Sequence, residues 1–321
     1  MRNVLAVMPF EERHRQYLER IGRGCAFTYT TIKDATPEQV CGADIILGNV
    51  DPQLVAQSRN LQWIQLNSAG ADAYCKSGIL RPGTLLTSAS GAYGLTVSEN
   101  LLAMTYMLCR KMDLYMRNQV AHRWEDAGSV TSIWNSTTLV IGLGDIGTEY
   151  ARRMKALGSY VIGVRKRASV KPDCVDEICG MEQLDTLLPR ADFVVLALPS
   201  TAQTRHIMDE GRMRRMKPGA YLINGGRGDA VDCDALNRLL REGTCLGGAG
   251  LDVTEPEPLP EDHPLWDAPR CIITPHIAGG FHLPETFERI VRITGENLEK
   301  YLAGDMEGMR NRIDPATGYR K

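Results

Sequence analysis

Three side chains in the second half of the chain could together hold and protonate a small carbonyl compound. His276 lies between a proline and a glycine pair, Glu257 lies in a proline-rich loop, and Arg227 lies in a glycine turn. A carboxylate beside a histidine favours the imidazolium, so such a pair can act as a general acid near neutral pH. An arginine offers a planar fork to a carboxylate or a carbonyl oxygen. With a hydride donor opposite, these residues would suffice to reduce a 2-oxo acid.

Each of these three residues follows a segment that the residue pattern predicts to be a strand. The strands are expected at residues 220–224, 248–253 and 271–274. Ligands of open α/β sheets bind at the carboxyl ends of the strands, so the three side chains are expected at one sheet edge. Taken singly, each has a more ordinary interpretation, as a packed histidine, an ion-paired arginine or a solvated acid. Their shared position favours a catalytic site.

A glycine turn earlier in the chain could supply the hydride donor. An apolar strand pattern runs into Gly-x-Gly-x-x-Gly and then into a helical pattern, which is the dinucleotide-binding context. Gly142 allows the tight turn, Gly144 lets the backbone approach a pyrophosphate, and Gly147 lets the helix pack on the strand. Asp145 and Ile146 lie at the helix N-terminus, where free N–H groups attract phosphates. A glycine turn without a ligand is the alternative.

The end of the next predicted strand, at residues 161–164, bears on the choice of dinucleotide. NAD-binding sites usually place an acid there for the ribose 2′-hydroxyl. This chain has Arg165, Lys166 and Arg167 instead, and the first acid after them is Asp173. Arginine suits a 2′-phosphate, to which it donates charge-assisted hydrogen bonds. We therefore favour NADP(H); a solvated basic turn that accepts NAD(H) is the alternative.

Length, charge and cysteine usage exclude several classes of protein. The 321 residues suffice for two domains with separate cores, and the net charge of −2 gives no bulk attraction to nucleic acid or membrane. The nine cysteines form no Cys-x-x-Cys pair, which indicates reduced thiols in the cytoplasm and no metal site. No apolar run approaches the length of a membrane span, and the first residues are expected to form a strand, not a signal peptide.

Strands alternate with helices along the first hundred residues, which predicts an α/β unit with a parallel sheet. A single long helix is predicted at about 97–120, leaving this unit, and another at 284–302. The nearly unbroken apolar run 193–198 is typical of a strand buried on both faces of a second parallel sheet. The tail from residue 304 is expected to pack back on the first unit.

We therefore predict an α/β protein of two Rossmann-like or flavodoxin-like domains. The nucleotide domain, residues 101–284, would be inserted into a substrate-binding domain made of residues 1–100 and 285–321.

Four motifs in this order resemble the signatures of the D-isomer-specific 2-hydroxyacid dehydrogenases. They occupy residues 142–147, 224–228, 251–258 and 274–279. The resemblance covers nearly the whole chain, and the basic end of the second strand is most similar to the glyoxylate/hydroxypyruvate reductase branch. The chain departs from the family at Asn100, where the family often has histidine, and we expect little consequence for the chemistry.

The resemblance implies a role for each candidate. Arg227 would bind the substrate carboxylate and carbonyl, His276 would protonate the carbonyl oxygen as hydride arrives, and Glu257 would keep His276 protonated. The cofactor would be lined by Pro199, Thr204, Gly225, Gly226 and, on the nicotinamide side, Asp252, together with Arg227 and His276. The substrate would also meet Asn49 and the backbone amides of Ala69 and Gly70. The family usually forms homodimers through the nucleotide domain, and its domains close about hinges, here near residues 100 and 284.

The substrate is expected to be an unphosphorylated 2-oxo acid such as glyoxylate or hydroxypyruvate, with the D-2-hydroxy acid as product. The two candidate substrate loops, 45–58 and 64–75, contain no lysine or arginine, so a phosphate would lack its usual partner. A 3-phosphoglycerate dehydrogenase is the alternative enzyme. An NAD(P)-sensing corepressor of the same fold is an alternative of another class, which the presence of Arg227, Glu257 and His276 disfavours.

Overall fold

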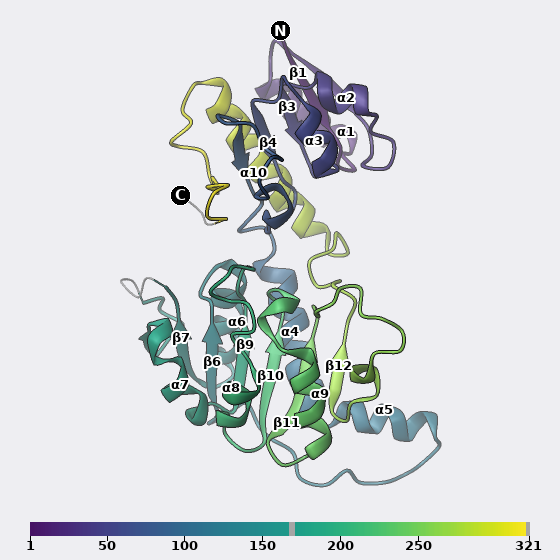
Figure 1. The fold of residues 1–321 in the computed structure, drawn as a ribbon, viewed down its shortest axis with the longest axis vertical. Coiled ribbons are helices and arrows are strands. Elements are labelled where there is room, and N and C mark those ends of the chain that lie inside the picture. The colour runs from purple at the N-terminus through teal and green to yellow at the C-terminus, as the bar shows by residue number, and fades with distance from the viewer. Residues whose placement is uncertain (167–170, 319–321) are drawn as a thin grey trace. The chain divides into compact units, whose positions relative to one another are not determined.

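The computed structural model describes residues 1–166 and 171–318 of the chain. It divides into two compact units, one of Met1–Tyr93 with Phe281–Lys321 and one of Gly94–Gly280. Each unit is a parallel α/β sheet with helices packed on it (Figure 1). The predicted fold class is confirmed. None of the described helices is both long and apolar enough to cross a membrane.

The first unit has a five-stranded sheet of order β2-β1-β3-β4-β5, in which every pair is parallel. Its strands and N-terminal helices are β1 (Arg2–Ala6), α1 (Glu12–Ile21), β2 (Cys25–Tyr29), α2 (Pro37–Gly42), β3 (Ile45–Leu47), α3 (Pro52–Gln57), β4 (Trp63–Gln65) and β5 (Leu85–Thr87). The helices begin where the sequence offers caps: Thr36 accepts from Gln39 N, and Asp51 accepts from Gln53 N, each followed by proline.

The C-terminal part of the chain completes the first unit. Helix α10 (Pro284–Leu302) lies beside its sheet (Figure 1), and Asn297 Nδ2 donates to the buried Gln65 Oε1 at 2.8 Å. The tail then pairs with the edge strand β5, since Ile313 N donates to Leu86 O at 2.9 Å. Ile313 is buried in the core of this unit. The expected return of the tail to the first unit is confirmed.

The second unit has a seven-stranded parallel sheet of order β12-β11-β10-β9-β6-β7-β8. Its strands are β6 (Thr137–Ile141), β7 (Tyr160–Val164), β8 (Glu177–Cys179), β9 (Phe193–Leu196), β10 (Ala220–Asn224), β11 (Leu246–Leu251) and β12 (Cys271–Ile273). All four residues of β9 are buried, as expected for a central strand. Strand β8, at the sheet edge, was not predicted, because its residues Glu-Ile-Cys directly follow Asp176 and show no apolar strand pattern.

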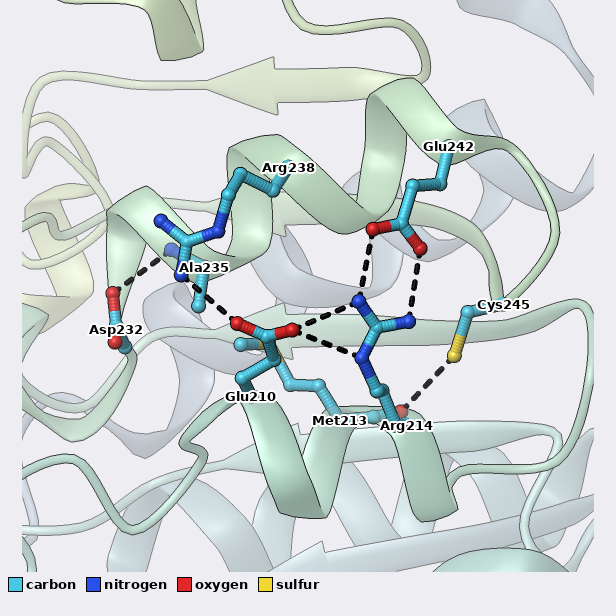
Figure 2. Close-up of polar contacts among 8 residues, drawn as sticks. All are labelled: Glu210, Met213, Arg214, Asp232, Ala235, Arg238, Glu242 and Cys245. Carbon is cyan, nitrogen blue, oxygen red and sulfur yellow. Dashed lines mark hydrogen bonds and ion pairs between the residues drawn. The ribbon is translucent and has the colours of Figure 1, made fainter.

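Helices α6 (Asp145–Ala156), α7 (Leu184–Leu187), α8 (Glu210–Arg215) and α9 (Cys233–Glu242) connect these strands. Exposed ion pairs join α8 to α9: Arg214 lies between Glu210 and Glu242, and Arg238 also contacts Glu210 (Figure 2). At the start of α9, Asp232 accepts a hydrogen bond from Ala235 N.

The single long helix predicted at 97–120 is wrong. The structure has two helices, α4 (Gly94–Cys109) and α5 (Met112–Val120), separated at Lys111, whose φ of 57° is left-handed. Arg270, far along the chain, donates to Asp113 and to the carbonyl of Leu108 in the last turn of α4. The break depends on these tertiary contacts, and the local sequence offers neither glycine nor proline to signal it.

Candidate active site

The strand ends of the second unit lie in register along one sheet edge. Ile141 of β6 pairs with Val164 and Leu196, Asn224 pairs with Leu196 and Leu251, and Leu251 pairs with Ile273. The segments that follow these strands are therefore neighbours. The strand order reverses between β6 and β9, which is where open α/β sheets bind their ligands.

The glycine turn after β6 has the geometry that a dinucleotide requires. A Cβ on Gly142, whose φ is +101°, would lie 2.5 Å from Ala197 O, and one on Gly147 would lie 1.9 Å from Gly142 O. Both glycines are thus required by close backbone contacts within the protein. A Cβ on Gly144, in contrast, would meet no atom within 4 Å. Open space above this glycine, at the N-terminus of α6, fits the approach of a pyrophosphate.

The two other predicted residues of this turn lie in the first turn of α6. The Asp145 carboxylate accepts a hydrogen bond from Gly94 N at 2.6 Å, at the start of α4. Its side chain is therefore engaged within the protein, and the predicted cofactor contact of Asp145 and Ile146 depends on their backbone amides.

The basic residues lie at the end of β7, the strand next to β6. Arg165 and Lys166 directly follow Val164, and Arg165 N donates to Cys179 O of β8 at 3.2 Å. Arg167 lies outside the described residues. The position of Arg165 and Lys166, one strand away from the glycine turn, is the one where a Rossmann site contacts the adenosine ribose.

The hydroxyl group of Thr204 shapes the segment after β9. Thr204 Oγ1 donates to Pro199 O at 2.7 Å and accepts from Thr201 N at 2.9 Å. Both residues predicted to line the cofactor thus belong to one compact turn at the switch point. Their contact with the cofactor stays a prediction.

The arginine turn after β10 is held against the segments on either side of it. A Cβ on Gly226 would lie 2.6 Å from Leu198 N, and one on Gly228 would lie 1.8 Å from Thr254 O. Asn224 Nδ2 donates to Arg227 O at 2.9 Å, and Arg227 Nη1 donates to Gly226 O at the same distance. The backbone around Arg227 is therefore fixed, and its side chain is half-buried.

The structure brings His276 and Glu257 together, as predicted. His276 Nδ1 lies 2.5 Å from Glu257 Oε1. With Nδ1–H donated to the carboxylate, Nε2 at the tip of the ring is left for a substrate. The two side chains are 44% and 42% exposed, so a small molecule can reach them.

Asp252 shapes the turn that carries the histidine. Its buried carboxylate accepts from Thr274 Oγ1 at 2.6 Å, Ile277 N at 3.0 Å and Ala278 N at 3.2 Å, and its carbonyl accepts from His276 N at 2.8 Å. These contacts hold His276 at a φ of +52°, a conformation that costs energy for a residue other than glycine. Sequence reasoning gave Asp252 a cofactor contact and missed this role.

In the first unit, the predicted substrate residues lie after β3 and β4. Asn49 N donates to Asn67 Oδ1 at 2.7 Å, Asn67 N donates to Asn49 Oδ1 at 3.0 Å, and Asn49 Nδ2 donates to Ser68 Oγ at 3.1 Å. Asn49 thus joins the two loops. The amides of Ala69 and Gly70 donate to no protein acceptor in the part of the chain that the structure describes, so an anion could accept from them.

Sequence reasoning also missed a second histidine–glutamate pair beside the first. His206 Nε2 lies 2.6 Å from Glu255 Oε2, and Arg205 Nη2 lies 2.7 Å from Glu255 Oε1. The signal was present, because Glu255 and Glu257 belong to one Glu-Pro-Glu-Pro run and the two cations follow Thr204 directly.

Comparison with known proteins shows the family of the chain. Residues 102–278 match the NAD-binding domain of the D-isomer specific 2-hydroxyacid dehydrogenases. The chain is 32% identical to a glyoxylate/hydroxypyruvate reductase B of Pectobacterium carotovorum, over 88% of this chain and 87% of that protein. It is 33% identical to an (S)-sulfolactate dehydrogenase of Chromohalobacter salexigens, over 87% and 93%.

Among solved structures, a D-isomer specific 2-hydroxyacid dehydrogenase family protein of Aeromonas salmonicida superposes with a TM-score of 0.85. That protein is 29% identical in sequence, and the match covers 98% of this chain and 99% of that one. Together with the glycine turn and the aligned strand ends, these matches show that the chain belongs to the D-isomer specific 2-hydroxyacid dehydrogenase family and is an oxidoreductase that uses a nicotinamide cofactor.

Proposed function

We propose that the chain reduces a small unphosphorylated 2-oxo acid, such as glyoxylate or hydroxypyruvate, to the D-2-hydroxy acid with NADPH. The observation that carries this proposal is the His276–Glu257 pair. Its 2.5 Å contact uses Nδ1 and leaves Nε2 at the exposed tip of the ring, on the same sheet edge as Arg227 and the glycine turn. A general acid in this arrangement can complete the reduction of a carbonyl group.

When bound, the cofactor supplies a hydride to the carbonyl carbon. His276 Nε2–H gives its proton to the carbonyl oxygen, and Glu257 stabilises the imidazolium before this transfer and orients the ring. Arg227 holds the substrate carboxylate and carbonyl through its guanidinium fork. In the first unit, the amides of Ala69 and Gly70, which donate to no acceptor among the described residues, stay candidates for binding a substrate anion.

The preference for NADPH follows from Arg165 and Lys166 at the end of β7, where an acid would favour the 2′-hydroxyl of NADH. Replacing Arg165 by alanine should lower kcat/KM for NADPH more than for NADH, since only NADPH carries the phosphate. A wild-type enzyme with the higher kcat/KM for NADH would refute the preference.

The absence of lysine and arginine from residues 45–58 and 64–75 supports an unphosphorylated substrate. The decisive experiment is a panel of 2-oxo acids assayed with both cofactors, including glyoxylate, hydroxypyruvate, phosphohydroxypyruvate and 3-sulfopyruvate. We expect the highest kcat/KM for glyoxylate or hydroxypyruvate, and a kcat lowered by about 10²–10⁴-fold in the His276→Asn variant. Failure to reduce any 2-oxo acid would refute the proposed function. A preference for phosphohydroxypyruvate would favour the 3-phosphoglycerate dehydrogenase alternative.

We also propose that the chain forms a homodimer through the second unit. Helix α5 and the segment after it extend from the body of this unit (Figure 1). They carry the exposed apolar side chains of Met112, Met116, Val120, Trp124 and Trp134. Several large apolar side chains exposed in one segment are typical of a protein interface. Sedimentation should give a dimer for the wild type, and Val120→Glu should weaken it; a monomeric wild type would refute the proposal.

A further inference from the structure

We propose that Glu255 is a positioning residue that acts through Glu257. Its ion pairs with Arg205 and His206 would hold the segment Thr254–Pro258 in place, and so keep the Glu257 carboxylate on His276 Nδ1. This inference depends on the proposed function, because it assigns a task to a residue of the same site.

The segment that carries Glu257 has little backbone support of its own. Two of its five residues are prolines, which lack an N–H group. Among the described residues, no backbone–backbone hydrogen bond involves any part of residues 254–258. One local contact is present, from Thr254 Oγ1 to Pro256 O at 2.9 Å. A segment without backbone hydrogen bonds opens locally at low cost, so side-chain contacts must fix it.

Glu255 provides such contacts with both oxygens of its carboxylate. Oε1 lies 2.7 Å from Arg205 Nη2, and Oε2 lies 2.6 Å from His206 Nε2. The Glu255 side chain is 29% exposed, less than that of Glu257 two residues later. Of the two glutamates, Glu255 is therefore the one turned toward the protein.

Backbone hydrogen bonds hold the segment that carries Arg205 and His206 in place. His206 N donates to Asp229 O at 2.6 Å, and Met208 N donates to Ala230 O at 2.9 Å. Ser200 Oγ also donates to the Asp229 carboxylate. The segment after β9 is thus bonded to the arginine turn after β10, so Glu255 connects the general-acid pair to the residues that surround Arg227.

Loss of the Glu255 ion pairs should affect turnover more than the stability of the fold. Partly exposed ion pairs contribute little to global stability. A catalytic group displaced by about 1 Å, however, can cost up to about 10²-fold in rate. Loss of Glu255 should therefore reduce turnover while the fold and the affinity for the cofactor stay close to wild type.

The test compares Glu255→Ala with Glu261→Ala. Glu261 is an exposed acid of the same loop and has no ion pair or hydrogen bond among the described residues. At saturating NADPH and 2-oxo acid, Glu255→Ala should lower kcat about tenfold, and Glu261→Ala should leave it unchanged. Glu255→Gln keeps the length and one acceptor of the side chain and should recover part of the loss. An unchanged kcat in Glu255→Ala would overturn the inference.

A double variant shows whether Glu255 acts through Glu257. In a Glu257→Gln background, Glu255→Ala should have no further effect on kcat, because the carboxylate that it positions is gone. Multiplicative losses would mean that Glu255 acts by another route, and would refute the inference.

A readout without turnover keeps this test independent of the proposed function. In NMR spectra of the protein with labelled histidine, the ring signal of His276 is assigned from its loss in His276→Asn. Glu255→Ala should move this signal in the same direction as Glu257→Gln, and Glu261→Ala should not move it. If the wild type reduced no 2-oxo acid, the proposed function would fail while this comparison still decided the role of Glu255.

Discussion

Two histidine–glutamate pairs lie on neighbouring loops of this protein, and they differ in which ring nitrogen meets the carboxylate. His276 uses Nδ1, the nitrogen nearer the backbone, and therefore presents Nε2 at the tip of the ring. His206 uses Nε2 itself, and its glutamate is shared with Arg205. The first arrangement leaves a proton donor pointing outward, and the second uses the tip of the ring for a structural contact. We therefore propose that the same two residue types serve chemistry in one pair and position in the other.

The largest effect should come from removing the ring that presents Nε2. His276→Asn should lower kcat by about 10²–10⁴-fold, the range for a positioned general acid. Steady-state kinetics with the 2-oxo acid found in the panel measures this change, and fluorescence titration should show nearly unchanged affinity for NADPH. Turnover at the wild-type level would remove His276 from the mechanism.

A smaller effect should follow from removing its carboxylate. Glu257→Gln should lower kcat by about 10–10²-fold, because a neutral amide supports the imidazolium less well. The loss should appear in kcat, with the affinity for NADPH close to that of the wild type. A kcat equal to that of the wild type would show that the contact has no part in proton transfer.

Removing the histidine of the second pair, His206–Glu255, should have a weaker effect on kcat. His206→Asn leaves the Arg205 contact with Glu255 in place, so kcat should fall only about two- to fivefold. A fall in kcat as large as that of His276→Asn would contradict the distinction between the two pairs.

The smallest effect should come from an ion-pair network outside the site. Arg214 bridges Glu210 and Glu242 on the exposed faces of α8 and α9 (Figure 2). Hydrogen bonds from Arg238 and then Arg214 hold the pKa of Glu210 below its usual value, and a hydrogen bond from Arg214 lowers the pKa of Glu242. A carboxylate whose pKa is lowered by folding stabilises the fold at pH values above the normal pKa of glutamate. This stabilisation is lost in acid, as the carboxylate takes up a proton.

Arg214→Ala should therefore lower the Tm slightly at neutral pH and leave kcat unchanged. Because the carboxylates are protonated well below a pH of about 4, the difference in Tm should vanish there. Thermal unfolding at the two pH values measures it; a difference that grew in acid would contradict the assigned ion pairs.

The sequence predicted most of the features that depend on residues near one another in the chain, such as strands and turns. The apolar runs placed β7, β9, β10, β11 and β12 of the second sheet, and the strand–glycine–helix order located the turn at residues 142–147. The break at Lys111 could not be predicted, because Arg270 reaches the end of α4 from 162 positions away. The role of Asp252 was missed for the same reason: a motif indicates that an acid is needed, and only the fold shows its partners.

Local sequence patterns were enough to predict the fold class and the family, and to propose the reacting side chains, since strand periodicity, glycine spacing and proline positions act over short stretches of chain. The tertiary structure alone decided which histidine nitrogen faces a carboxylate and which glutamate faces solvent. Glu255 and Glu257 are identical residues two positions apart in one repeat, so no local pattern separates them. They differ because the neighbouring loop places Arg205 and His206 beside one of them and the His276 turn beside the other.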